Sequence, residues 1–232
     1  MTVPLPKPHA IGLALLCLAA AASTGAAHSL EELESQLGER ERYFQPFDKK
    51  APAFELRDAD GRTVRLSDSR GKVVVLNFIY ASCPDVCPLH SRRIAEIQEM
   101  IALTPMQGQV QFVSVTTDPD RDTPEVLRGY GLAHGLDPAN WLFLTSGPGR
   151  PAATRRLAER YGHKFTLAEG GYQVHGVVTH VIDGEGRWRA NFHGLKFDPA
   201  NLVVFVNALV NDAHRPHPHD GPGFWQKLRE LF

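Results

Sequence analysis

The chain has 232 residues, of which 43% are hydrophobic and 22% are charged, and this composition is that of a globular protein. Its length fits one ordinary domain with appended segments. The formal net charge is −1, and basic residues alternate with acidic ones instead of clustering. These features exclude a broad nucleic-acid-binding surface, and we expect no nucleic-acid partner.

The N-terminal residues 1–27 have the pattern of an export segment. Lys7 and the α-amino group supply a weak positive charge, residues 10–22 form an apolar core, and small residues precede His28. The pattern fits a cleaved signal peptide, or a retained membrane anchor slightly shorter than the roughly 20 residues of a span. We therefore expect an exported protein, periplasmic or anchored facing the periplasm, where disulfides persist. Residues 28–46 read as a spacer, helical over 30–43.

Residues 47–212 carry the pattern of one α/β domain. Short alternating runs at 54–56 and 63–66 predict a hairpin, and continuous apolar runs at 73–79 and 110–115 predict buried strands. Helices are predicted over 89–103, 123–133, 152–161 and 202–210, with a short strand at 141–144 and an antiparallel pair at 177–182 and 188–192. This order is typical of a thioredoxin-like sandwich with a peroxiredoxin-type N-terminal hairpin. Residues 213–232 form a tail rich in His and Pro.

Two of the three cysteines follow the predicted strand 73–79 directly, in the segment Cys83-Pro84-Asp85-Val86-Cys87-Pro88. Pro88 suits the first turn of a helix, which places Cys87 near the N-cap and Cys83 on the preceding loop. The positive end of a helix dipole favours thiolate there. A purely structural disulfide is the simplest alternative, although so short a loop removes little chain entropy.

Copper binding and dithiol redox chemistry both fit this pair. Two thiolates that converge across a short loop suit Cu(I), and an added imidazole would suit Cu(II). Structural zinc normally needs four protein ligands, and the mature chain has no further cysteine. In redox chemistry, Cys83 would be the attacking thiolate and Cys87 the resolving thiol. A thiol peroxidase would require a Thr close before Cys83, which is absent.

A histidine stands near the point where thiol oxidoreductases of this fold place a proline. His175 lies in the run that leads into the late hairpin, and no proline occurs between Pro151 and Pro199. Three segments in order then resemble the SCO/SenC family, exported copper chaperones for the binuclear copper site of cytochrome c oxidase. They are Phe78-Ile79-Tyr80-Ala81-Ser82-Cys83-Pro84-Asp85-Val86-Cys87-Pro88, Thr117-Asp118-Pro119-Asp120-Arg121-Asp122-Thr123-Pro124-Glu125, and His175, eight residues before Asp183.

The resemblance covers residues 47–208 and implies that Cys83, Cys87 and His175 bind one copper ion, as Cu(I) or Cu(II). The protein would deliver it to the copper-receiving subunit of cytochrome c oxidase or to another exported cuproprotein. It would be primarily a metallochaperone, with the redox state of the pair controlling loading and a thiol reductant as a further partner. Val174 and Gly176 stand where the family often has Asp and Ser, so the surroundings of the imidazole differ. The main alternative is a thiol–disulfide oxidoreductase that reduces cysteines of cuproproteins or other exported clients.

Two other histidine patterns have simpler interpretations. His180 is five positions from His175, so on one strand the two side chains would point to opposite faces, and His180 would be an ordinary strand histidine. His214, His217 and His219 form a His-rich run, either a solvated tail or one that gathers metal.

The acidic run 118–122 resembles a metal cluster but fits a helix start better. Asp122 with Glu125 predicts a capping box, with Pro124 in the first turn. The alternative is a role at the copper loop, for which Asp118 is the best candidate.

Overall fold

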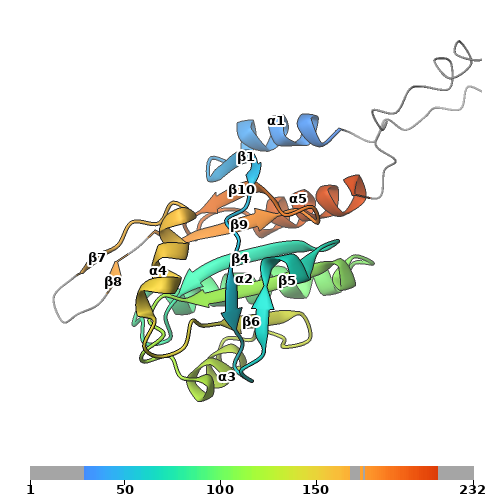
Figure 1. The fold of residues 1–232 in the computed structure, drawn as a ribbon. Helices are drawn as coiled ribbons and strands as arrows, with labels where there is room; N and C mark the ends of the chain where they lie inside the picture. The colour runs from blue at the N-terminus through green and yellow to red at the C-terminus, as the bar shows by residue number, and fades with distance from the viewer. Residues whose placement is uncertain (1–28, 168–172, 175, 214–232) are drawn as a thin grey trace, which may run out of the picture.

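A mixed six-stranded sheet organises the fold. The computed structural model describes residues 29–167, 173–174 and 176–213, and the strand order within them is β1-β10-β9-β4-β5-β6. The strands are β1 (Phe44–Lys50), β4 (Val73–Ile79), β5 (Val110–Thr116), β6 (Trp141–Leu144), β9 (Val178–Ile182) and β10 (Arg187–His193). Strands β4, β5 and β6 run parallel, whereas β1, β10, β9 and β4 pair antiparallel in turn (Figure 1).

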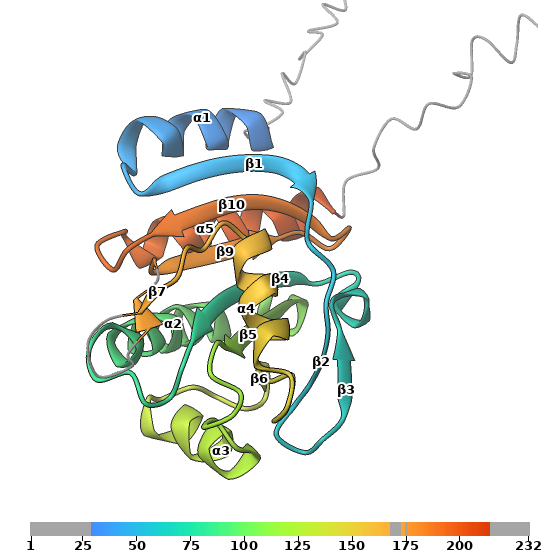
Figure 2. The same ribbon diagram turned by 60° about the vertical axis from the view of Figure 1, so that its left-hand side comes forward.

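Helices cover both faces of this sheet. One face packs against α1 (Leu30–Arg40), α2 (Val86–Ala102), α3 (Pro124–Ala133) and α5 (Pro199–Asp212). The other face packs against α4 (Pro151–Arg160) and the hairpin of β2 (Glu55–Arg57) and β3 (Thr63–Arg65). Figure 2 shows α4 in front of the sheet and α2 and α5 behind it. The short elements are η1 (Leu66–Ser69), η2 (Gln107–Gln109), β7 (Thr166–Leu167) and β8 (Gln173–Val174).

Strand β4 is the centre of the core because all of its residues are buried. Successive side chains of a strand point to opposite faces. Val73, Val75 and Ile79 accordingly join the apolar cluster under α2 and α5, and the cluster under α4 contains Val74, Leu76 and Phe78. The apolar run 73–79 thus forms the doubly buried strand that the sequence predicts, and the cysteines follow it.

The predicted elements of the domain are all present, with boundaries shifted by a few residues. The thioredoxin-like α/β fold is confirmed. Strand β1 is an addition to the six-stranded sheet that the sequence does not predict: it pairs with β10 from Phe44 to Lys50, while α1 packs on α5. Part of the stretch that reads as a spacer is therefore built into the folded body. Its edge position explains the weak signal, since Pro46 and charged residues are tolerated where one side of a strand is unpaired.

No helix within the described ranges is long and apolar enough to cross a membrane. The predicted export segment 1–27 and the tail from residue 214 lie outside those ranges, so the assignments made for them remain predictions.

Gly131 of α3 packs directly against a fixed aromatic ring. A Cβ atom at Gly131 would lie 2.2 Å from Cζ3 of Trp141. The ring cannot easily move, because Nε1 of Trp141 donates to Oγ of Ser114 at 3.1 Å in the sheet interior. A larger residue at position 131 would have to displace either the helix or this hydrogen bond.

Gly131→Ala should therefore lower the free energy of unfolding by about 1–3 kcal/mol, the usual cost of overpacking. Gly129→Ala is the matched control, because it lies in the same helix with no atom within 4 Å of the new Cβ. That control should gain up to about 1 kcal/mol from helix propensity. Urea unfolding of the two variants measures the difference, and equal stabilisation of both would contradict the contact.

Candidate metal centre

The two cysteines lie where β4 ends and α2 begins. The carbonyl of Ile79 accepts the N–H of Thr117 at 2.8 Å, and the carbonyl of Tyr80 accepts the N–H of Cys83 at 3.2 Å, so the chain turns immediately after the strand. Helix α2 begins at Val86 with Asp85 as its N-cap. Cys87 is thus the second residue of the helix, two positions past the N-cap and close to where the sequence predicts it. Both cysteines are buried free thiols.

The sulfur of Cys83 supplies an acceptor that the N-cap side chain does not. Asp85 makes no side-chain capping bond, so an N–H group of the first turn is open to another acceptor. The N–H of Cys87 donates to Sγ of Cys83 at 3.4 Å. The positive end of the helix dipole adds to this bond. Both effects favour an anionic sulfur on Cys83.

Hydrogen bonds lower the pKa of Cys83 to about 5. The largest cause is the bond from the Cys87 thiol; burial opposes it, and the N–H groups of Asp85 and Cys87 and the Tyr80 side chain add to it. The same thiol–thiolate bond, together with burial, raises the pKa of Cys87. At neutral pH the pair therefore holds one thiolate and one thiol. This arrangement suits a soft metal ion or nucleophilic attack on a disulfide.

Of the three predicted copper ligands, the structure brings Cys83 and Cys87 together. His175 lies outside the described residues, as do His214, His217 and His219. Elsewhere, within 29–167, 173–174 and 176–213, no three His, Cys, Asp or Glu side chains could together hold a metal ion. The pairing of β9 with β4 nevertheless shows where β9 begins relative to the cysteines. Thr179 lies opposite Asn77 in an antiparallel pair, so the start of β9 lies beside the carboxyl end of β4, where the cysteine loop begins.

The acidic run contacts the cysteine loop through Asp122. The carboxylate of Asp122 accepts the N–H of Ala81 at 3.1 Å and the hydroxyl of Thr116. The predicted capping box is wrong, because Thr123 is the N-cap of α3 and its Oγ1 accepts the N–H of Val126 at 3.5 Å. Asp118, the expected candidate at the loop, instead pairs with Arg121. Asp122 thus makes the loop contact that the sequence predicts for Asp118, and Thr123 takes the capping role predicted for Asp122.

His180 belongs to a buried chain of polar groups on the face of the sheet that packs against α4. Nε1 of Trp188 donates to Oδ1 of Asn191 at 2.8 Å, and Nδ1 of His180 lies 2.6 Å from the same oxygen. Because that oxygen accepts, Nδ1 of His180 carries a proton, and its Nε2 accepts from Nε2 of His163 at 2.9 Å. His180 is thus a structural strand histidine, as predicted. Burial above all, and then His163, lower its pKa well below 6.5.

Two contacts beside the cysteines were not singled out from the sequence. His90 is one turn beyond Cys87, and its Nε2 lies 2.8 Å from Oγ1 of Thr179, joining α2 to β9. Ser91 lies on the next position, and its hydroxyl bonds to that of Tyr130 of α3 at 3.0 Å. Their spacing from Cys87 on the buried face of α2 was the available signal. These contacts fix the helix that carries Cys87.

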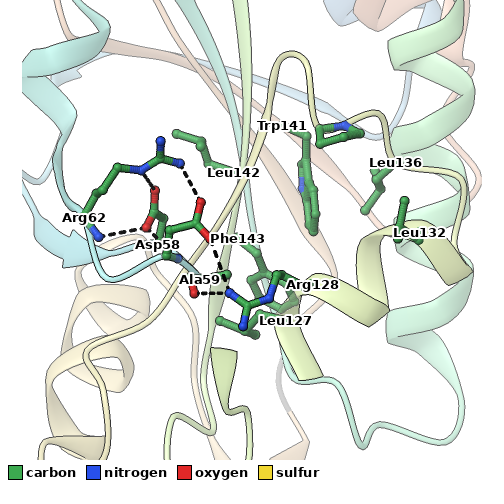
Figure 3. A pocket seen from close by; sticks show the side chains of 12 residues that line it. Asp58, Ala59, Arg62, Leu127, Arg128, Leu132, Leu136, Trp141, Leu142 and Phe143 are labelled. Carbon is green, nitrogen blue, oxygen red and sulfur yellow. Dashed lines mark hydrogen bonds and ion pairs between the residues drawn. The ribbon is translucent and has the colours of Figure 1, made fainter. Parts of the chain in front are cut away.

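A cavity of about 310 Å³ lies away from the cysteines, between the β2–β3 turn, α3 and β6 (Figure 3). Leu127, Leu132 and Trp141 line it, and Asp60 at its rim pairs with Arg62 and Arg128. Its lining contains neither cysteine nor histidine, so it is separate from the candidate metal centre.

The low pKa of Cys83 can be tested by removing its main cause. Cys87→Ala should raise the pKa of Cys83 from about 5 toward the ordinary value of a thiol, about 8.5. Cys87→Ser retains a hydroxyl donor and should raise it less. The ultraviolet absorbance of the thiolate as a function of pH gives the midpoint for each variant. Identical midpoints in the alanine variant and the unmodified chain would refute the hydrogen bond as the cause.

The buried His180 predicts acid sensitivity. Because folding lowers the pKa of His180, this side chain binds a proton below about pH 6.5 in the unfolded chain but stays neutral in the folded chain. The free energy of unfolding should be highest above that pH. It should decrease as the pH is lowered further, by up to about 1.4 kcal/mol per pH unit. Urea unfolding across this range should show a smaller slope in His180→Gln. An unchanged slope in that variant would remove His180 as the cause.

Comparison with known proteins agrees with the motifs. The family model described as SCO1/SenC matches residues 44–211. A protein of Stutzerimonas stutzeri named for copper binding is 29% identical over 166 residues, covering 68% of this chain and 77% of that protein. An SCO2-like protein of Rickettsia typhi is 27% identical over 162 residues, covering 66% of this chain and 74% of that one.

Solved structures agree as well. An SCO1/SenC family lipoprotein from Bacillus anthracis is 27% identical with a TM-score of 0.64, covering 71% of this chain and 97% of that one. Copper-bound ScoI of Bradyrhizobium japonicum is 26% identical with a TM-score of 0.57, covering 69% and 99%. The resemblance carried by the cysteine motif and the acidic signature is therefore confirmed, and the chain belongs to the SCO1/SenC family.

Proposed function

We propose that this protein is a copper chaperone that binds one copper ion through Cys83, Cys87 and His175. The observation that carries the proposal is the pair of buried free thiols at the start of α2, in which the N–H of Cys87 donates to the sulfur of Cys83. Thiolate sulfur is a soft ligand that prefers Cu(I). The copper-bound ScoI structure and the copper-binding relative from Stutzerimonas stutzeri support the same cargo.

His175 is the proposed third ligand. The start of β9 lies beside the carboxyl end of β4, since Thr179 pairs with Asn77. A histidine shortly before β9 therefore belongs to the part of the chain that leads into the edge of the sheet where the cysteine loop begins. An imidazole there would complete a three-ligand site and would extend its affinity to Cu(II).

The protonation of the pair sets the chemistry of loading. A copper ion held by both sulfurs needs two thiolates, so binding releases the proton of Cys87. Transfer then proceeds by ligand exchange, in which sulfurs of the chaperone are replaced one at a time by ligands of the recipient. Oxidation of the apo pair joins the two sulfurs, releases two electrons and the Cys87 proton, and leaves no thiolate to bind copper. The redox state therefore controls loading, and a thiol reductant restores the binding form.

The family assignment also supports a recipient and a location. We infer that the recipient is the copper-receiving subunit of cytochrome c oxidase, at its binuclear copper site. Residues 1–27 would export the protein or anchor it. The folded domain would comprise residues 47–212 together with α1 and the start of β1, and residues 213–232 would follow it as a tail. The name of the Bacillus anthracis lipoprotein supports an exported, membrane-attached protein.

A thiol–disulfide oxidoreductase is the second candidate function. It is favoured by the unequal protonation of the pair, because a nucleophile that is already a thiolate beside a protonated resolving thiol suits disulfide exchange. In that role Cys83 attacks the disulfide of an exported client, and Cys87 then displaces the client from the mixed disulfide.

A Cu(I) competition titration of the reduced chain tests the chaperone. We expect one tightly bound equivalent, with affinity reduced at least tenfold in Cys83→Ser and in His175→Ala. His193→Ala is the matched histidine control, because His193 bonds Gln45 at 2.9 Å on the β1–β10 pair, and it should bind as the unmodified chain does. A variant in which His214, His217 and His219 are all replaced shows how much of the copper binding is due to the tail.

The same variants distinguish the two functions. His175→Ala should leave disulfide exchange by Cys83 and Cys87 nearly unchanged while weakening copper retention. Weak copper binding that is insensitive to His175, with exchange lost in His175→Ala, would reverse the assignment in favour of the oxidoreductase.

A further inference from the structure

The carboxylate of Asp122 is buried between two loops. It is 2% exposed and lies in the connection between β5 and α3, far along the chain from the cysteines. Its oxygens lie 3.1 and 3.3 Å from the backbone nitrogen of Ala81, which donates to them. The hydroxyl of Thr116 also donates to Oδ2. Asp122 therefore joins the acidic signature to the segment that leads into Cys83.

The position of this carboxylate is set by the sheet. Ile79 and Thr116 are the last paired residues of the parallel strands β4 and β5. Beyond them the N–H of Thr117 donates to the carbonyl of Ile79 at 2.8 Å, and the N–H of Asp122 donates to the carbonyl of Asp118 at 3.0 Å. The turn thus folds back on itself, and its last acid reaches the neighbouring loop.

Ala81 lies at the point where the loop changes direction. It follows Tyr80, whose carbonyl accepts the N–H of Cys83, and that turn carries Sγ of Cys83 to the N–H of Cys87. The orientation of the Ala81 peptide therefore bears on the distance between the two sulfurs. Without an acceptor at Asp122, the half-buried Ala81 N–H would favour a loop conformation that reaches water.

Asp122 is not itself suited to be a copper ligand. Both of its oxygens already accept hydrogen bonds from the protein. Carboxylate oxygen is also a hard ligand, which Cu(I) does not prefer. Its contacts correspond instead to those of a group that orients the segment carrying a ligand.

We propose that Asp122 is a positioning residue for the cysteine pair: by accepting the Ala81 N–H, it holds the loop in the arrangement that keeps both sulfurs together in the reduced state. The copper consequence rests on the proposed function, whereas the redox consequence does not. Losing the contact should disfavour the ordered dithiol, and with it the copper-binding form. The effect should be restored by any side chain that again presents an oxygen to Ala81.

The test uses the full chain with three variants. Asp122→Ala removes the acceptor, Asp122→Asn retains one oxygen acceptor, and Asp120→Asn removes a charge from the same loop at an exposed residue with no bond to the cysteine loop. Two quantities are measured for each: the equilibrium of the Cys83–Cys87 disulfide with a glutathione couple, and the Cu(I) affinity by chelator competition.

Asp122→Ala should shift the thiol–disulfide equilibrium about tenfold toward the disulfide, about 30 mV for two electrons, and should lower Cu(I) affinity at least tenfold. Asp122→Asn should recover most of both quantities, and Asp120→Asn should match the unmodified chain. A purely structural role would lower the melting temperature without moving the equilibrium of the folded protein. Should Asp122→Ala fail to fold, Thr116→Val removes the hydroxyl that orients the carboxylate and should shift both quantities in the same direction.

The outcomes separate the two proposals. If the unmodified chain binds no Cu(I) but Asp122→Ala still shifts the disulfide equilibrium, the copper function fails and the positioning role stands. If the unmodified chain binds Cu(I) and the variants at positions 122 and 116 match Asp120→Asn in both measurements, the positioning role is overturned.

Discussion

The parallel pairing of β4 with β5 is the constraint on which the candidate site depends. Parallel strands end at the same edge of a sheet, so the segments that follow Ile79 and Thr116 leave the core side by side. The cysteine loop and the acidic signature meet there although they are distant in the sequence. Strand β9 runs in the opposite direction on the other side of β4 and begins at this same edge. Three separate segments of the chain thus converge because β4 pairs with β5 along one edge and with β9 along the other.

At that edge, the backbone determines the electrostatics more than the charged side chains do. Asp85 lies between the cysteines but caps nothing with its side chain, and the sulfur of Cys83 accepts a helix N–H in its place. Two residues of the same type consequently acquire opposite protonation preferences. The difference arises above all from the bond between them, in which Cys87 donates and Cys83 accepts, and the N–H groups at the start of α2 add to it.

The order of elements could be predicted from the sequence because its signals are local. A continuous apolar run such as 73–79 has to be buried, and its length and composition favour a strand. Strand β1 lacked such a signal, because Pro46 and three charged residues stand in an edge strand whose partner, β10, lies far along the chain. Only tertiary pairing makes it a strand.

The roles of Asp118 and Asp122 could not be separated by local pattern either. Both Asp122 and Thr123 are good N-cap residues, and the capping rule fits either of them. The distinction comes from the N–H of Ala81, which is near in space and remote in sequence. Likewise, the hydrogen-bond partners of His180 come from β10 and from the segment after α4, which strand periodicity does not reveal.

The packing of α1 on α5 has a consequence for how the molecule presents its reactive end. Both ends of the described chain, the start of α1 and the end of α5, lie on one side of the fold, while β4 runs toward the other side and delivers the cysteines there (Figures 1 and 2). An attachment at either terminus would therefore hold the molecule by its far end. The end of the fold that carries Cys83 and Cys87 would face away from the attachment point, and a recipient could approach the buried thiols from that side.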